Sequence, residues 1–215
     1  MISFHFCYDL QYFEFYNFQI TSNPFFLNYR LVIVNLFLFI VGVSLYLANQ
    51  NGINWQKVQK RALILFGASA LITVVTYFIF PKSWVYFGVI HFIFVASLAA
   101  LAFIKHPFLA LVGSIAIAIL YFGGFISMHP LFNYLADILH LPKYHTEDLV
   151  PFIPWFATVL AGVAFGGFKL FRFLDIKENF ITSKVALLGK HALLIYLVHQ
   201  PILFALLYII KATIN

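Results

Sequence analysis

Residues 191–210 read HALLIYLVHQPILFALLYII, an apolar run long enough to cross a lipid bilayer, with His199, Gln200 and Pro201 at its centre. Water does not reach that depth, so polar side chains there need partners inside the protein. An ionisable residue in such a position is a functional-site hypothesis by default. The segment therefore predicts a transmembrane helix that carries chemistry.

The whole chain has the composition of a membrane protein. It is 63% hydrophobic and 9% charged, with 28 Phe and 12 Tyr among its 215 residues. Few helix-length windows are polar enough for a surface that faces water. We predict an all-α, polytopic helical membrane protein that forms a single domain over residues 1–215, with room for about seven transmembrane segments. The one cysteine, Cys7, excludes an internal disulfide.

Six apolar stretches of spanning length are separated by polar breaks or by breaks that contain Pro or Gly. They are residues 29–48, 62–80, 85–104, 108–126, 152–170 and 191–210. A seventh stretch, residues 1–8, is too short to cross and lacks the charged start and cleavage site of a signal peptide. We interpret it as the second half of a first helix, either because the sequence begins late or because this span is truncated.

Loop charges orient the predicted bundle. Nine of the 13 basic residues lie in the loops 49–61, 105–107 and 169–190: Lys57, Lys60, Arg61, Lys105, Lys169, Arg172, Lys177, Lys184 and Lys190. Because Lys and Arg collect on the cytoplasmic side, these loops are predicted inside and the 127–151 connection outside. Within that connection, FNYLADILHL has polar and apolar residues at helical spacing and is expected to lie along the outer interface. The basic residues form no continuous stripe, so no nucleic-acid partner is expected.

Three histidines are candidate catalytic residues. His5 and Asp9 are one helical turn apart, so the carboxylate is placed to orient the imidazole as a base near the outer end of the first helix. His199 falls near the middle of the membrane and His91 falls closer to its outer face. The competing interpretation is structural, because a buried histidine often only hydrogen-bonds a neighbouring helix, and Pro201 alone would kink its helix.

A basic cluster offers a second kind of site. Lys57, Lys60 and Arg61 come directly before a predicted helix, where positive side chains and free backbone N–H groups suit phosphates. Lys190, at the start of the last predicted helix, has the same character. The alternative is that these residues are only topology signals, since short cytoplasmic loops are basic anyway.

The outer connection also contains potential metal ligands. They are His140, His145, Glu147 and Asp148. Their spacing matches no specific metal-binding pattern, so we expect solvated side chains and no metal cofactor.

Five segments in series resemble a known family. They are MISFHFCYDLQYF, FLFIVGVSLYLA, KRALILFGASALIT, WVYFGVIHFIFVASL and LGKHALLIYLVHQPI. Together they are similar to the bacterial branch of the heparan-alpha-glucosaminide N-acetyltransferase catalytic-domain family, within the transmembrane acyltransferases. The resemblance implies transfer of an acyl group, most simply acetyl, from cytoplasmic acyl-CoA to a sugar hydroxyl or amine on the outer side. Two departures are the missing Arg-Gly stretch before the first helix and an unrecognisable loop pattern, which makes heparan a poor substrate guess.

The resemblance also assigns roles. His5 matches the first-helix histidine of the wider group, which implies a base, or an acyl-histidine, oriented by Asp9. His91 and His199 would position the thioester, and a set of cations would bind acyl-CoA (acetyl-CoA): Lys57, Lys60, Arg61 and Lys190. The implied partners are the lipid bilayer and an extracytoplasmic glycan or glycolipid acceptor, in a multi-pass protein of the bacterial inner membrane. A homo-oligomer is left open.

Two other classes of protein compete with this interpretation. A haem- or quinone-binding redox protein would use the same histidines as ligands, although His5, His91 and His199 are expected at different depths. A small-solute transporter would have halves with mirrored broken helices, and no such repeat is seen in the sequence.

Overall fold

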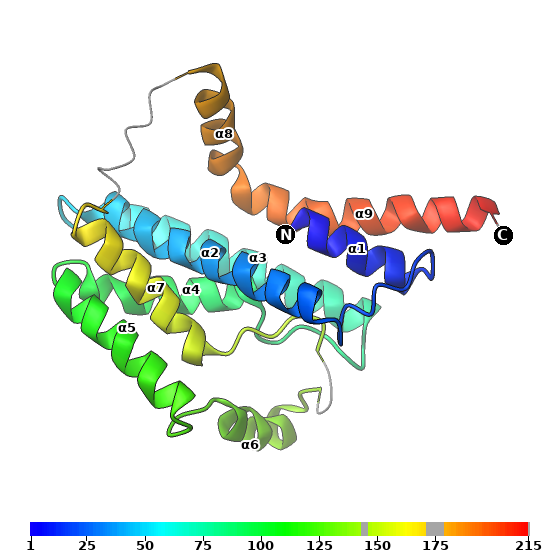
Figure 1. Ribbon diagram of the computed structural model, residues 1–215, viewed down its shortest axis with the longest axis horizontal. Helices are drawn as coiled ribbons and strands as arrows, with labels where there is room; N and C mark the ends of the chain where they lie inside the picture. The colour runs from blue at the N-terminus through cyan, green and yellow to red at the C-terminus, as the bar shows by residue number, and fades with distance from the viewer. Residues whose placement is uncertain (143–145, 171–178, 215) are drawn as a thin grey trace. The chain divides into compact units, whose positions relative to one another are not determined.

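The computed structural model describes residues 1–142, 146–170 and 179–214. These residues form helices and one isolated β-bridge, with no strand among them. The elements are α1 (Ile2–Tyr12), α2 (Pro24–Asn49), α3 (Trp55–Ile79), α4 (Val89–Ala100), η1 (Leu101–Phe103), α5 (Pro107–Phe122), α6 (His129–Leu139), α7 (Phe152–Gly167), α8 (Phe180–Lys190) and α9 (Ala192–Ile214) (Figure 1). The predicted all-α class is confirmed.

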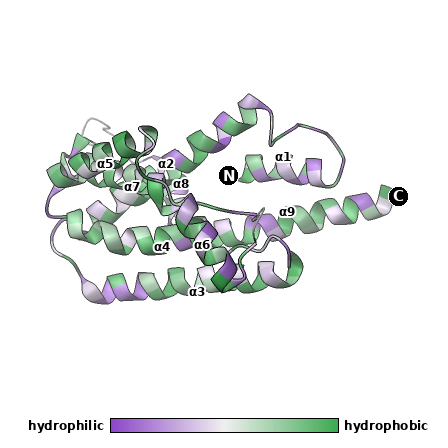
Figure 2. Cartoon of the chain, turned by 90° about the horizontal axis from the view of Figure 1, so that it is seen from below, coloured by the Kyte–Doolittle hydropathy of each residue, from purple (hydrophilic) through white to green (hydrophobic). Residues whose placement is uncertain are grey.

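The helices are those of a polytopic membrane protein. By length and composition, α2, α3 and α9 can each cross a bilayer, and the apolar helices α4, α5 and α7 are shorter. Large apolar side chains face outward along these helices, as in Phe78, which is 77% exposed, and Phe122, which is 84% exposed. Figure 2 shows hydrophobic residues over most of each of these helices. Such surfaces suit lipid and not water, and each predicted span coincides with one of these helices or, at the start of the chain, with α1.

The chain forms two compact units, which we describe separately. One unit comprises Met1–Val34 and Leu174–Asn215, and the other comprises Asn35–Phe173. The prediction of a single domain over residues 1–215 stays a prediction.

In the unit Asn35–Phe173, α2 and α7 cross with almost no side chain between them. A Cβ atom added to Gly42 would meet the carbonyl oxygen of Val159, and one added to Gly162 would meet the carbonyl oxygen of Phe39. Close backbone approach through small residues is a common way for helices to pack in membranes, where the hydrophobic effect does not drive association. Helix α5 packs along α7, and the Ser114 hydroxyl donates a 2.8 Å hydrogen bond to the Ala157 carbonyl.

The segment before α4 is fixed by a second segment from the 127–151 connection. The carboxylate of Asp148 accepts a 2.8 Å hydrogen bond from the backbone N–H of Val89, at the start of α4. The Ser83 hydroxyl donates to Glu147 at 2.7 Å, and the Val150 N–H donates to the Phe87 carbonyl at 3.1 Å. A carboxylate at a helix start pairs with N–H groups that have no partner within the helix.

Two predicted loops contain helices. The amphipathic segment in the 127–151 connection is helical as predicted and forms α6, which ends at His140 in a left-handed conformation with a φ of 52°. The prediction that residues 169–190 form a loop was wrong in part, because α8 occupies the second half of this segment. Asn179 and Thr182 form a reciprocal capping box that starts this helix, a signal that the charge argument ignored. Arg172, Lys177, Lys143 and His145 lie outside the described residues.

In the other unit, α1 lies beside α9 (Figure 1). Helix α1 extends to Tyr12, so it is longer than the predicted 1–8 segment. Near the end of α9, the Lys211 ammonium donates to the Phe13 carbonyl at 2.7 Å and to the Glu14 carboxylate at 3.1 Å. These contacts hold the C-terminal part of α9 against the end of α1.

Candidate active site

Four polar side chains from α1 and α9 meet inside an apolar helix pair. The Gln200 amide donates a 2.8 Å hydrogen bond to one oxygen of the Asp9 carboxyl. The imidazole rings of His5 and His199 lie edge to face, with their centroids 5.0 Å apart. Residues that are far apart in the sequence thus form one cluster, which we call the α1/α9 cluster: His5, Asp9, His199 and Gln200.

The hydrogen bonds of His199 define its tautomer. Its Nδ1 lies 2.7 Å from the carbonyl oxygen of Tyr196, which can only accept, so Nδ1 carries the proton. In the neutral ring, the Nε2 atom is then the acceptor. It is buried and has no hydrogen-bond partner among the described residues. A neutral imidazole with a free Nε2 lone pair is the form that a general base needs.

Other polar atoms of the cluster also lack partners. Asp9 is 1% exposed, and its second oxygen has no hydrogen bond within the described part of the chain. The amide oxygen of Gln200 is also buried and has no hydrogen-bond partner among the described residues. Pro201 has no N–H, so the Leu197 carbonyl loses its usual helical partner at this level of α9. Because buried polar groups are nearly always hydrogen-bonded, this concentration of unpartnered atoms makes the α1/α9 cluster the candidate functional site.

The structure places Asp9 differently from the sequence-based expectation. His5 and Asp9 lie on the same helix, but no hydrogen bond joins them among the described residues, and Asp9 pairs with Gln200 across the helix interface. Spacing along one helix fixes which face a residue occupies, and the partner helix decides which hydrogen bonds form there. Gln200 was not among the predicted site residues, although its position beside His199 in an apolar run was a usable signal.

His91 is fully engaged in local hydrogen bonds in the other unit. Its Nδ1 accepts from the backbone N–H of Gly88 at 3.3 Å. Its Nε2 must then carry the proton and donate to the Thr73 hydroxyl at 2.9 Å, while that hydroxyl donates to the Val85 carbonyl at 2.9 Å. Both ring nitrogens are used in joining α3 to the start of α4. This arrangement favours a structural role for His91, and its catalytic role stays a prediction.

Two of the predicted phosphate-binding residues line a narrow pocket at the start of α3. The pocket has a volume of about 80 Å³ and includes Lys57, Arg61 and Ser97. Asn54 caps α3 by accepting a 3.1 Å hydrogen bond from the Lys57 N–H. The Ser97 hydroxyl is buried without a partner among the described residues, and Arg61 forms no ion pair within them. Two cations and a buried hydroxyl form a site suited to an anionic group.

The remaining predicted cations lie elsewhere. Lys60 is exposed and does not line this pocket, although it is next to Arg61 in the sequence. Lys190 is the last residue of α8 and is also exposed, in the other unit. The structure therefore separates the predicted cluster into two residues that share a pocket and two that do not.

The acidic residues of the outer connection have other partners. Glu147 accepts from Ser83 and Asp148 caps α4, as described above. Within the described part of the chain, no group of three His, Cys, Asp or Glu side chains could hold a metal ion. His145, the fourth residue of the proposed set, lies outside the described residues.

A family comparison identifies the class of protein. The sequence model described as heparan-alpha-glucosaminide N-acetyltransferase, catalytic, matches residues 1–201. The chain belongs to this family. Searches among curated proteins and among solved structures give no match.

Membership in the heparan-alpha-glucosaminide N-acetyltransferase catalytic family confirms the resemblance drawn from the sequence. The family is one of membrane acetyltransferases, in agreement with the apolar helices of this chain. The match begins in α1 and ends inside α9, so it includes the whole α1/α9 cluster and both pocket cations.

Proposed function

We propose that the protein transfers an acyl group, most simply acetyl, from cytoplasmic acyl-CoA to a sugar hydroxyl or amine on the outer side of the membrane. The observation that carries this proposal is the unpartnered Nε2 atom of His199, buried beside His5, Asp9 and Gln200 in the region that matches the acetyltransferase family. A bacterial inner membrane is the proposed location. The orientation of the chain rests on the distribution of its basic loops.

In the proposed reaction, His199 acts as the general base. Its Nε2 removes the proton from the acceptor hydroxyl or amine as that atom attacks the carbonyl carbon of the thioester. The carbon–sulfur bond breaks, and the coenzyme A thiolate leaves and takes the proton that His199 Nε2 received from the acceptor, which restores the neutral imidazole. Neither ring nitrogen of His5 has a hydrogen-bond partner among the described residues, and the N–H of its neutral ring would donate to the developing oxyanion. The sequence alone had assigned the base to His5.

Asp9 and Gln200 are proposed to bind the acceptor. The free Asp9 oxygen and the free Gln200 amide oxygen can each accept a hydrogen bond from an amine or hydroxyl. The hydrogen bond between the two side chains holds these acceptors in one orientation. The acceptor would thereby gain partners for its N–H or O–H groups at the place where it loses water.

Arg61 and Lys57 are proposed to bind the phosphates of the donor. Both line the pocket at the start of α3, together with the unpartnered Ser97 hydroxyl. Phosphate oxygens accept hydrogen bonds from guanidinium, ammonium and hydroxyl groups, and charged pairs of this kind are the stronger ones. Lys60 and Lys190 remain predicted donor contacts without a shared pocket.

The competing haem proposal is disfavoured by the spacing of the imidazole pair. A haem iron held on its two opposite faces by two ring nitrogens, each at about 2 Å, would keep the ring centroids farther apart than the observed 5.0 Å.

The test is transfer of radiolabelled acetyl from acetyl-CoA to glucosamine by the full chain in proteoliposomes. His199→Ala should lower the rate about 10²-fold or more, because general-base catalysis is commonly worth that much, while acetyl-CoA binding is retained. His129→Ala, which changes an exposed histidine of α6, serves as the matched control. Wild-type rates in both His199→Ala and His5→Ala, each with a native fold, would exclude the mechanism.

A further inference from the structure

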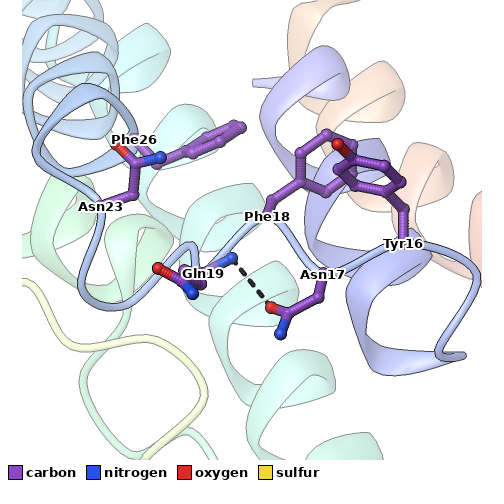
Figure 3. Close-up of a pocket in the computed structure, with 6 residues that line it drawn as sticks. All are labelled: Tyr16, Asn17, Phe18, Gln19, Asn23 and Phe26. Carbon is purple, nitrogen blue, oxygen red and sulfur yellow. Dashed lines mark hydrogen bonds between the residues drawn. The ribbon is translucent and has the colours of Figure 1, made fainter.

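The loop between α1 and α2 contains a hollow that the proposed reaction does not use. It has a volume of about 420 Å³ and is lined by Tyr16, Asn17, Phe18, Gln19, Asn23 and Phe26 (Figure 3). All six lining residues are aromatic or carry a side-chain amide, and none is charged. Ligand sites of this size typically combine apolar walls with a few placed polar groups.

Backbone hydrogen bonds set the orientation of two of the amides. The Asn17 side-chain oxygen accepts from the Gln19 N–H at 3.1 Å, as Figure 3 shows, and the Asn23 side-chain oxygen accepts from the Phe25 N–H at 2.9 Å. Because each oxygen faces a backbone donor, the two NH₂ groups remain as donors. Gln19 adds an exposed amide with both a donor and an acceptor.

The aromatic rings form a continuous wall. The Tyr16 and Phe18 ring centroids are 4.5 Å apart, and those of Phe18 and Phe26 are 5.5 Å apart. Phe26 is buried and anchors the row, whereas Tyr16 is 63% exposed and leaves ring surface for a ligand. The loop is also tied back to α1, since the Gln11 side chain accepts a 3.1 Å hydrogen bond from the Ile20 N–H.

We propose that this loop binds an uncharged sugar, and that it holds the glycan part of the acyl acceptor. Sugar rings have apolar C–H faces that pack on aromatic rings, and hydroxyl or acetamido oxygens that accept hydrogen bonds from amides. The absence of lysine, arginine, aspartate and glutamate from the lining disfavours a phosphate or an amine as the bound group. The acceptor role rests on the proposed function, whereas the binding itself does not.

The binding test uses N,N′-diacetylchitobiose and saturation-transfer difference NMR on the full chain in lipid nanodiscs, which avoid sugar-based detergents. Tyr16→Ala should weaken binding about fivefold or more, because it removes the exposed ring, and Tyr16→Phe should bind like wild type. Tyr208→Ala is the matched control, since Tyr208 is also 63% exposed but does not line the hollow. Glycerol phosphate should not compete. Equal binding by Tyr16→Ala and Tyr208→Ala would overturn the proposal.

A second experiment distinguishes a free sugar from a lipid-linked sugar as the ligand. It also distinguishes failure of the sugar site from failure of the proposed acyl transfer. The same disaccharide on a lipid tail, incorporated into the nanodisc, should show the same dependence on Tyr16, and tighter binding than the free sugar would identify a glycolipid acceptor. Sugar binding that depends on Tyr16, without acetyl transfer, would refute the proposed function and leave the site standing. Acetyl transfer with binding insensitive to Tyr16 would refute the site and leave the function standing.

Discussion

At the scale of single residues, Gln200 connects the two helices of the candidate active site. Its amide satisfies one oxygen of a carboxyl that is 1% exposed, in an environment where an unpaired polar group is costly. The same side chain keeps its own oxygen unpartnered beside His199. Gln200 therefore couples the packing of α1 on α9 to the polar groups proposed to bind the acceptor.

Replacing Gln200 with Leu should destabilise the protein by about 1–3 kcal/mol, because Asp9 then loses its hydrogen bond without leaving the apolar interior. Thermal unfolding in nanodiscs measures this effect. The double variant Asp9→Leu/Gln200→Leu should recover part of the stability, since no lone polar group remains, yet it should stay inactive. Gln56→Leu, at an exposed position of α3, is the control. If the double variant loses as much stability as the two single variants together, Asp9 and Gln200 do not form a pair.

Replacing Arg61 with Ala should weaken coenzyme A binding, because the pocket loses its guanidinium, and the difference from wild type should shrink as salt rises. Titration calorimetry with coenzyme A and with dephospho-coenzyme A identifies the phosphate involved. Lys60→Ala removes a neighbouring cation that does not line the pocket and should bind almost normally. If both variants bind coenzyme A as tightly as wild type does, these basic residues only set the orientation of the chain in the membrane.

The sequence predicted which residues form the candidate site better than it predicted the hydrogen bonds between them. The positions of His5, Asp9 and His199 in apolar helices mark them from sequence alone, because ionisable groups at such depths are rare. The pairing of Asp9 with Gln200 depends on how α1 is rotated against α9, and no spacing within either helix encodes that rotation. For His91, no motif in the chain indicated that Thr73 and Gly88 would use both ring nitrogens.

At the scale of helices, the contact of α2 with α7 depends on two glycines. A methyl group at Gly162 would meet the carbonyl oxygen of Phe39, and backbone cannot move aside as a flexible side chain can. The hydropathy of these segments predicted both helices but not their crossing. A usable signal was the G-x-x-x-G spacing of Gly162 and Gly166, which is typical of closely packed membrane helices and which Gly67 in α3 lacks. The start of α8 was also missed, because the capping residue Asn179 begins this helix at a point where the hydropathy of the chain does not change.

Gly162→Ala should destabilise the protein by about 1–3 kcal/mol through overpacking at this crossing. Gly67→Ala is a matched control with the opposite expectation. Its new methyl group meets nothing within 4 Å, and alanine is the better helix former by up to about 1 kcal/mol. Unfolding temperatures of the two variants in the same lipid provide the comparison. Similar temperatures for both would show that the α2 and α7 backbones are not in close contact.

At the scale of the whole molecule, composition alone established a membrane protein, and apolar runs of spanning length located α2, α3, α4, α5, α7 and α9. The orientation of the chain across the membrane stays a prediction that rests on nine of the 13 basic residues. Contacts within a chain cannot reveal orientation, because the two sides of a bilayer differ in solution conditions and not in packing.

Orientation is tested by cysteine labelling in intact cells, in a Cys7→Ser background. A cysteine at His140 should react with an impermeant maleimide from outside, and a cysteine at Lys57 should react only after the membrane is opened. Both native side chains are exposed, so burial does not account for a difference between them. The reverse pattern would invert the topology, and with it the assigned sides of donor and acceptor.

The cap on α4 links two positions that are far apart in the sequence. A Cβ at Gly88 would run into the carboxylate of Asp148, and that carboxylate holds the Val89 N–H. Across related sequences, positions 88 and 148 should therefore change together, with a larger residue at 88 accompanied by a shorter one at 148. A substitution at Asp148 would therefore destabilise the start of helix α4. A compensating substitution at Gly88, about sixty positions earlier in the sequence, would restore it.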